Sequence, residues 1–513
     1  MALCSCGNFL EEHSQNMAYL ENIEDLDELL IGECYLARGA SRYEQNATTS
    51  GYWSTIVTDG NFFPIIHLLD DDVAEYVYTP RPETNWPRMK LSQFHYWQQD
   101  PWRDSQFEEL EDQNWSNTYR RIAVINTILS EVENFRGVEI GNDSTCNRIK
   151  GEALFLRAQN YFWLANLYGR PYCKATAATD VCVPLKTTDP VEDRFFSRSP
   201  MEEVYGQIYQ DLRDAAESFR GVRSLGVYRA NQAAAFALLS RVCLYMERYD
   251  EAVAYADSVL QMREFSLLDF NTRSVSDTSS IMYASSPETI FTQGPNIMMV
   301  IHAPLDRTLR MVSGYTSSQD LLDCFDENDR RLDLFFKARQ APAGGQRCVK
   351  WREGYATTGE VSDCMALRLP EVYLNKAEAL ALLGRDAEAL AVIRELRENR
   401  IEGEDDLNYS GRDLVYFIRE ERRRELCFEG HRWFDLRRYA VNTEYPQTKT
   451  IEHISLTYVD GGNPEGEQQG KYVLNPYDQE PAAYMLPVPR TEVEFNEGAL
   501  TNDPRNERPI QAL

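Results

Sequence analysis

The segment from Arg419 to Tyr439 reads REERRRELCFEGHRWFDLRRY, and no other stretch says as much about the fold. It holds too many charges for an ordinary core and too many aromatic rings for a solvated linker. Glu420 and Arg424 are four residues apart, a spacing that makes side chains neighbours on a helix surface. We therefore predict a helix that ends at Gly430 and carries a ladder of i,i+4 contacts. This ion-paired helix end is expected to pack against its neighbours and to perform no chemistry.

Helical periodicity also runs through the segments upstream. Mostly apolar residues recur at three- and four-residue steps, which predicts amphipathic helices. The segments Arg248–Ala252 (RYDEA) and Arg385–Ala389 (RDAEA) each follow one such helix and begin another, and their small residues let antiparallel helices approach as in tetratricopeptide units. The three clearest stripes are Trp115, Tyr119, Ile122, Asn126 and Leu129; Leu154, Ala158, Tyr161, Ala165 and Tyr168; and Val204, Ile208, Leu212, Ala215 and Phe219.

The chain between those two copies lacks helical periodicity and is rich in Ser, Asp, Gly and Pro. About 100 loop residues inside a compact domain would be exceptional, so we expect them to form a second layer. The sequence thus predicts a mostly helical scaffold at about 110–263 and 368–440. A loop-rich layer with a few short strands is predicted at about 40–110, 264–367 and 440–513.

Composition excludes several classes of protein. Lys and Arg total 53 against 81 Asp and Glu, and the resulting net charge of −28 argues against a nucleic-acid-binding protein. No stretch approaches the roughly 20 apolar residues of a membrane-spanning helix, so any membrane attachment is expected through a lipid.

Catalysis has little support in the sequence. The motifs GxSxG, HExxH and GxxxxGK(S/T) are absent. A glycoside hydrolase would need two carboxylates about 5 to 9 Å apart across a cleft. Adjacent acids such as Asp70-Asp71-Asp72 and Asp405-Asp406 are expected to be solvated instead. We therefore predict that the protein is not an enzyme.

Several further segments accompany Arg419–Tyr439. They are Leu3–Cys6 followed by Gly7–Glu11, Arg368–Ala379 (RLPEVYLNKAEA), and Tyr484–Asn496 with its PVP run. Together these segments resemble the SusD/RagB family, the lipid-anchored nutrient-binding proteins of outer-membrane glycan importers of the starch-utilisation type. The resemblance extends over nearly the whole chain.

This resemblance implies four tetratricopeptide-like helix pairs in a right-handed superhelical scaffold, within one domain at 21–513 whose loop-rich layer bears the ligand site. It implies a cell-surface lipoprotein of the outer membrane, lipidated at Cys6, that passes oligosaccharides to a TonB-dependent transporter. The charged and long apolar parts of a signal peptide are missing, so residues 1–20 are expected to be a trimmed signal and tether. The alternative is a tetratricopeptide scaffold that binds protein, peptide or glycoprotein for a similar importer, with a glycoside hydrolase as a more distant one.

The expected ligand site is aromatic. Sugar-binding surfaces place rings against the apolar face of a pyranose and aim Asp, Asn and Arg at its hydroxyls. The stretch from Tyr76 to Trp102 is the best candidate, because its many rings are interrupted by three prolines that argue against one regular element. For each ring, the alternative is that it seals the loop layer onto the helices. The predicted ligand-binding residues are Trp53, Asp59, Asn61, Tyr78, Arg81, Trp86, Tyr96, Trp97, Trp102, Tyr283 and Tyr315.

The cysteines predict no metal site. Cys173 with Cys182, and Cys348 with Cys364, flank loops and could form disulfides in an exported protein, but isolated thiols that act as small hydrophobic residues are favoured.

One loop, Arg400–Asn408, is similar to a loose cation-binding loop, although it lacks the fixed spacing of calcium ligands. We expect no cofactor, and calcium is only a weak candidate for this loop. Its acidic residues are Glu402, Glu404, Asp405 and Asp406.

Overall fold

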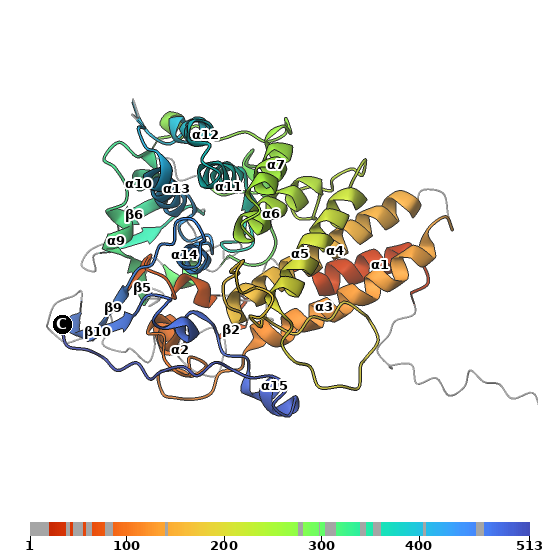
Figure 1. The fold of residues 1–513 in the computed structure, drawn as a ribbon, viewed down its shortest axis with the longest axis horizontal. Coiled ribbons are helices and arrows are strands. Elements are labelled where there is room, and N and C mark those ends of the chain that lie inside the picture. The colour runs from red at the N-terminus through yellow and green to blue at the C-terminus, as the bar shows by residue number, and fades with distance from the viewer. Residues whose placement is uncertain are drawn as a thin grey trace, which may run out of the picture.

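The computed structural model is mostly helical, with short strands (Figure 1), as the sequence predicted. It describes residues 20–36, 42–44, 55–57, 64–76, 86–138, 142–274, 281–296, 298–302, 314–338, 345–351, 361–403, 407–457 and 466–513. The scaffold helices are α3 (Gln113–Glu131), α4 (Asn142–Tyr168), α5 (Met201–Ser218), α6 (Gln232–Tyr245), α7 (Tyr249–Leu260), α11 (Leu369–Leu382), α12 (Asp386–Glu398), α13 (Gly411–Leu426) and α14 (Arg432–Ala440). The other helices are α1 (Ile23–Leu29), α2 (Trp86–His95), α8 (Met298–Ile301), α9 (Gln319–Leu322), α10 (Arg330–Phe335) and α15 (Arg490–Phe495).

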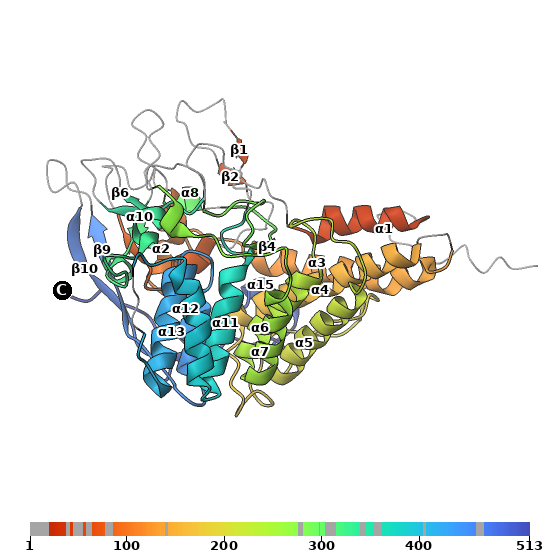
Figure 2. The same ribbon diagram turned by 90° about the horizontal axis from the view of Figure 1, so that it is seen from above.

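The scaffold is a continuous array of antiparallel helices. Each helix from α3 to α7 packs against the next, α7 packs against α11, and α11 packs against α12 and α13 (Figure 2). Every residue of the predicted stripes that begin at Leu154 and Val204 is buried, which confirms the helical periodicity there. After α11, Gly384 adopts a left-handed conformation (φ 72°) that reverses the chain into α12.

The two halves of the array are joined by buried polar contacts between α6 and α11. The Arg241 guanidinium donates two hydrogen bonds to the Glu371 carboxylate, at 2.5 and 2.6 Å. Asn375 Nδ2 donates to Ser240 Oγ at 2.9 Å. Residues 130 or more positions apart are thus held together, although the strand-bearing segment between α7 and α11 separates them in the sequence.

The strands form two-stranded antiparallel pairs in the part of the chain that the structure describes. Figure 2 shows β6, β9 and β10 beside the array of helices. The pairs are β1 (Arg42–Glu44) with β2 (Thr55–Val57), β3 (Val73–Glu75) with β5 (Tyr315–Ser317), β4 (Thr289–Phe291) with β8 (Leu367–Arg368), β6 (Phe336–Ala338) with β7 (Gln346–Cys348), and β9 (Ile451–Thr457) with β10 (Glu467–Leu474).

The predicted i,i+4 ladder on α13 was wrong. Glu425 is fully buried and binds arginines from other segments: Arg400 Nε at 2.9 Å, Arg331 Nη1 at 3.2 Å and Arg368 Nη2 at 3.4 Å. Glu421 also binds Arg331, at 2.7 Å. A ladder requires a solvated helix face, whereas α13 is surrounded by other elements. We call this buried group the ionic core; its members are Glu288, Arg331, Arg368, Arg400, Glu421 and Glu425.

The predicted end of this helix was also placed too late. Helix α13 ends at Leu426, and Gly430 (φ 75°) lies in the turn before α14. A Cβ atom at Gly430 would lie 3.0 Å from the Cβ of Cys364, so the turn needs glycine for space as well as for conformation.

The ionic core should make the free energy of unfolding depend on pH in the acid range. Burial alone would raise the pKa of Glu425, but Arg400, Arg368 and Arg331 outweigh it and lower the pKa to about 2 from an ordinary value of 4.5. The folded state therefore holds this carboxylate charged where the unfolded chain protonates it. We expect its contribution to the free energy of unfolding to be full above pH 4.5 and to be lost as the pH falls toward 2. Urea unfolding at a series of acid pH values measures this slope, and a Glu425→Gln variant should show a shallower one; an equal slope would contradict the assignment.

The cysteines with possible disulfide partners are free thiols. Cys173, Cys182, Cys348 and Cys364 are all unpaired, which agrees with isolated thiols. Burial raises the pKa of both Cys182 and Cys348 to about 12, so these two thiols are protonated and unreactive at neutral pH.

Candidate functional site

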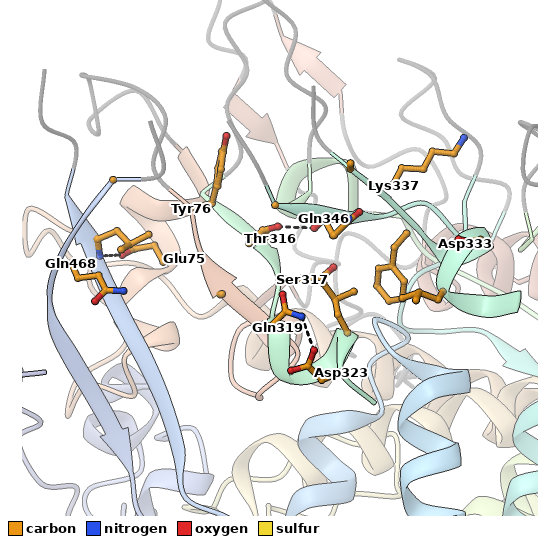
Figure 3. Close-up of a pocket in the computed structure, with 18 of the residues that line it drawn as sticks. Glu75, Tyr76, Thr316, Ser317, Gln319, Asp323, Asp333, Lys337, Gln346 and Gln468 are labelled. Atoms are coloured by element: carbon orange, nitrogen blue, oxygen red, sulfur yellow. Dashed lines mark hydrogen bonds between the residues drawn. The ribbon is translucent and has the colours of Figure 1, made fainter. Parts of the chain in front are cut away.

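A large open cavity lies among three of the strand pairs (Figure 3). Its volume is about 1290 Å³. Residues of β3, β5, β6, β7, β9 and β10 line it, together with α9 and α10. All of its lining residues come from the segments that the sequence analysis assigned to the loop-rich layer.

The walls of this cavity expose polar and apolar surface in nearly equal amounts. Gln319 Nε2 donates to Asp323 Oδ1 at 2.6 Å, and Figure 3 shows this pair facing the cavity. Apolar contact is supplied by Tyr76, Leu322, Leu332, Phe336 and Leu456. The polar lining side chains that are exposed or half-buried are Gln319, Asp323, Asp333, Lys337, Gln346, Glu467 and Gln468. Amides both donate and accept, and carboxylates accept, so this set suits a ligand that presents many hydroxyl groups.

The approach of β5 to β7 shapes one wall. Thr316 Oγ1 donates to the carbonyl oxygen of Gln346 at 2.6 Å. At Gly345 (φ 77°), an added Cβ would lie 2.6 Å from Thr316 Oγ1. Only glycine therefore fits this position, because both the space and the backbone conformation exclude a side chain.

The turn Asp70–Asp72 connects elements that line the cavity, namely β3, β5 and α9, to helices α13 and α14. Arg432 donates two hydrogen bonds to the Asp71 carboxylate, at 2.6 and 2.8 Å, and Arg423 Nε donates to Asp72 Oδ1 at 2.8 Å. The carbonyl oxygens of this turn accept from Ser318, which begins α9. The Arg419–Tyr439 segment thus positions β3, β5 and α9, which all line the cavity.

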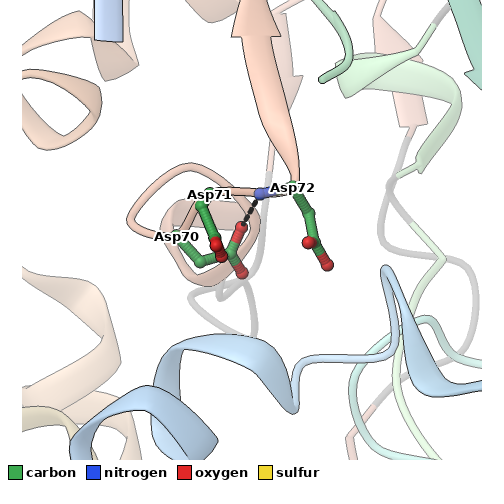
Figure 4. Close-up of side chains that lie close together, drawn as sticks. All are labelled: Asp70, Asp71 and Asp72. Atoms are coloured by element: carbon green, nitrogen blue, oxygen red, sulfur yellow. Dashed lines mark hydrogen bonds between the residues drawn. The ribbon is translucent and has the colours of Figure 1, made fainter. Parts of the chain in front are cut away.

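The expectation that these three aspartates are solvated was wrong. All three are buried, and Figure 4 shows Asp70 and Asp71 close together, with Asp70 accepting from the Asp72 amide. The three adjacent aspartates gave no indication in the sequence that they would be buried, because the arginines that compensate their charge lie about 350 residues further along the chain.

The charges around the turn also argue against a metal site there. The carboxylates are close enough to hold an ion. Burial would raise the pKa of Asp71, but Arg423, Arg432 and Lys449 outweigh it and hold the pKa well below its usual range. Burial and the neighbouring aspartates raise the pKa of Asp70 well above its usual range. Three cationic side chains therefore already supply the charge that a metal would bring.

Several predicted ligand-binding residues lie outside the described residues. They are Trp53, Asp59, Asn61, Tyr78 and Arg81, together with the side chain of Trp86, the first residue of α2. Cys6 and the acids Glu404, Asp405 and Asp406 also lie outside, whereas Glu402 is exposed.

The other predicted rings mainly serve packing. Trp97 is 1% exposed and donates from Nε1 to the Leu69 carbonyl at 2.9 Å. Tyr315 is fully buried in β5, and Tyr96 is buried with its hydroxyl 2.7 Å from Glu75 Oε1. These three rings therefore offer no open face to a ligand, which is the alternative that the sequence left open for each ring.

Two predicted residues remain partly accessible. Trp102 is half-buried, with its ring edge-to-face on Phe94 at a centroid distance of 4.9 Å. Tyr283 is half-buried too, and its carbonyl accepts from Thr289 Oγ1 at 2.9 Å. Neither residue lines the cavity.

Two protein-family models match this chain. A model described as "Starch-binding associating with outer membrane" matches residues 70–244, and the model of the SusD family matches residues 337–505. This chain belongs to the SusD family. Both the cavity anchor at Asp70–Asp72 and the Arg419–Tyr439 segment lie within these SusD-family matches.

Solved members of the SusD superfamily share the fold. One from Bacteroides thetaiotaomicron VPI-5482 is 21% identical with a TM-score of 0.69, and the match covers 94% of this chain and 100% of the other. A "SusD-like carbohydrate binding protein" from Bacteroides vulgatus ATCC 8482 is 20% identical with a TM-score of 0.66, covering 93% and 97%. At this identity the similarity establishes the fold alone.

One curated relative is similar in sequence. "SusD-like protein P38" of Formosa agariphila is 24% identical over 346 residues, which is 56% of this chain and 65% of the relative. The match thus spans just under two thirds of that relative. In the described part of this chain, no helix combines the length and apolar character that crossing a membrane requires.

Proposed function

We propose that this protein is a non-enzymatic glycan-binding lipoprotein of the outer membrane, and that it captures oligosaccharides at the cell surface for a TonB-dependent transporter. The observation that carries the proposal is the open cavity of about 1290 Å³, lined by amides and carboxylates, on a SusD-family scaffold. The description of the matching family model and the name of the Bacteroides vulgatus neighbour both point to carbohydrate.

The cavity has the chemistry that sugar capture needs. Glutamine side chains such as Gln319 and Gln468 can donate to and accept from hydroxyls, while Leu322, Leu332 and Leu456 supply apolar contact for C–H faces. Its volume of about 1290 Å³ leaves room for several sugar units. Binding without bond cleavage requires only this set of contacts, which the strand pairs and α9 and α10 position.

Membrane attachment and delivery complete the proposal. A lipid on Cys6 would tether the protein to the outer membrane, and the transporter would receive the glycan from the cavity. A stable complex with that transporter is expected to bury a large interface, because the two proteins would act as one machine.

The test is binding of the purified protein to a broad panel of polysaccharides, by affinity gel electrophoresis and calorimetry, with a reducing-end assay on the same mixtures. The proposal predicts binding to one class of glycan and no release of reducing ends. Release of reducing ends would establish a hydrolase instead. Failure to bind any glycan, together with binding of a peptide or glycoprotein, would favour the importer of protein ligands.

A further inference from the structure

We infer that the captured glycan is uncharged or carries amino groups, and that the cavity rejects sulfated and uronate-bearing chains. This inference rests on the proposed function and names its substrate class. It follows from the balance of charge on the cavity walls.

The charged groups that reach the cavity are mainly acidic. Asp323, Asp333 and Glu467 are exposed lining residues, and Lys337 is a half-buried one. Glu75 also lines the cavity, but it is buried and its two oxygens accept from the Tyr96 hydroxyl and the Leu456 amide. Among the described residues that line the cavity, accessible carboxylates therefore outnumber accessible ammonium groups by three to one.

Recognition of an anionic sugar calls for a different set of side chains. Sulfates and carboxylates are bound by arginine, whose planar fork of donors matches two oxygens at once. Among the described residues that line this cavity, there is no arginine. The amides of Gln319, Gln346 and Gln468 suit neutral hydroxyls and acetamido groups instead.

Electrostatics of the whole molecule act in the same direction. A net charge of −28 lowers the local concentration of polyanions around the protein. Within the cavity, carboxylates lie closer to a bound chain than the screening length of about 8 Å in physiological salt, so their repulsion of a sulfate is only partly screened. A like charge placed against such a surface costs several kcal/mol, which is more than tenfold in affinity.

The experiment compares one neutral polysaccharide that binds in the panel with the same polymer after partial sulfation and after oxidation of its primary hydroxyls to carboxylates. Wild type is expected to bind the neutral polymer and to bind both anionic derivatives at least about tenfold more weakly. In the triple variant Asp323→Asn, Asp333→Asn, Glu467→Gln, the ratio of the affinity for the neutral polymer to that for the anionic ones should fall toward one, because the amides still form hydrogen bonds but no longer repel anions.

A matched control separates local from overall charge. The variant Glu217→Gln, Asp413→Asn, Glu494→Gln removes three exposed acids away from the cavity and changes the net charge equally. It should behave like wild type. Tighter binding of an anionic polymer by wild type, or an equal fall of this affinity ratio in both triple variants, would overturn the inference and leave glycan capture standing. Absence of binding to every polymer would overturn the proposed function itself.

Discussion

A Glu425→Gln variant is expected to lose about 3–5 kcal/mol of stability, because neutralising one member of a buried ion group leaves part of its partners' charge uncompensated. Arg331, Arg368 and Arg400 all lie within 3.4 Å of this carboxylate, and all are buried. Glutamine preserves the shape of the side chain, so loss of charge is the main change. Urea unfolding monitored by circular dichroism at neutral pH measures the effect.

The control is Asp413→Asn on the same helix. Asp413 is exposed and pairs with the exposed Arg412 at 3.7 Å, so this change should alter stability by less than about 0.5 kcal/mol. Equal effects of the two substitutions would show that the buried charge of Glu425 does not stabilise the fold.

The second large effect is expected for Trp97→Ala, which should cost about 3–5 kcal/mol through the cavity that it leaves. The Trp97 ring stacks on His453 at a centroid distance of 4.2 Å, and the Arg508 guanidinium lies over the same ring at 5.8 Å from its centroid. The substitution therefore loosens the contact between α2, β9 and the C-terminal segment. Thermal unfolding of the purified variant is the measurement.

Phe495→Ala provides the comparison for Trp97, because the Phe495 side chain is 75% exposed and its removal should leave stability nearly unchanged. If Trp97→Ala kept full thermal stability but lost glycan binding, Trp97 would be a ligand-binding residue and its buried position in this structure would be wrong.

The helical scaffold could be predicted because its signal is local. Residues such as Tyr161 and Ala165 recur at helical spacing, and burial of one face follows from that spacing alone. The resemblance to the family rested on motifs of a few consecutive residues, and such motifs can be recognised in a single sequence.

The ionic core and the cavity could not be predicted, because both depend on contacts between distant residues. Nothing near Asp71 in the sequence indicates that it will be buried and paired with Arg432, which lies 361 positions later. The cavity is built from strands as short as three residues, such as β3 and β5, which carry no periodicity. Aromatic content pointed to Trp97 and Tyr315, since rings that pack and rings that bind sugar look alike in sequence.

The central claim is that the cavity between the strand pairs binds glycan, and calorimetry of a double variant tests it most directly. Gln319→Ala with Gln468→Ala removes two exposed amides from the cavity, and Gln210→Ala with Gln261→Ala removes two exposed amides from the scaffold. For the polysaccharide that wild type binds, the cavity variant should bind about tenfold or more weakly at unchanged thermal stability, and the scaffold variant should bind as wild type. Full affinity in the cavity variant would contradict the claim and place the site elsewhere on the protein.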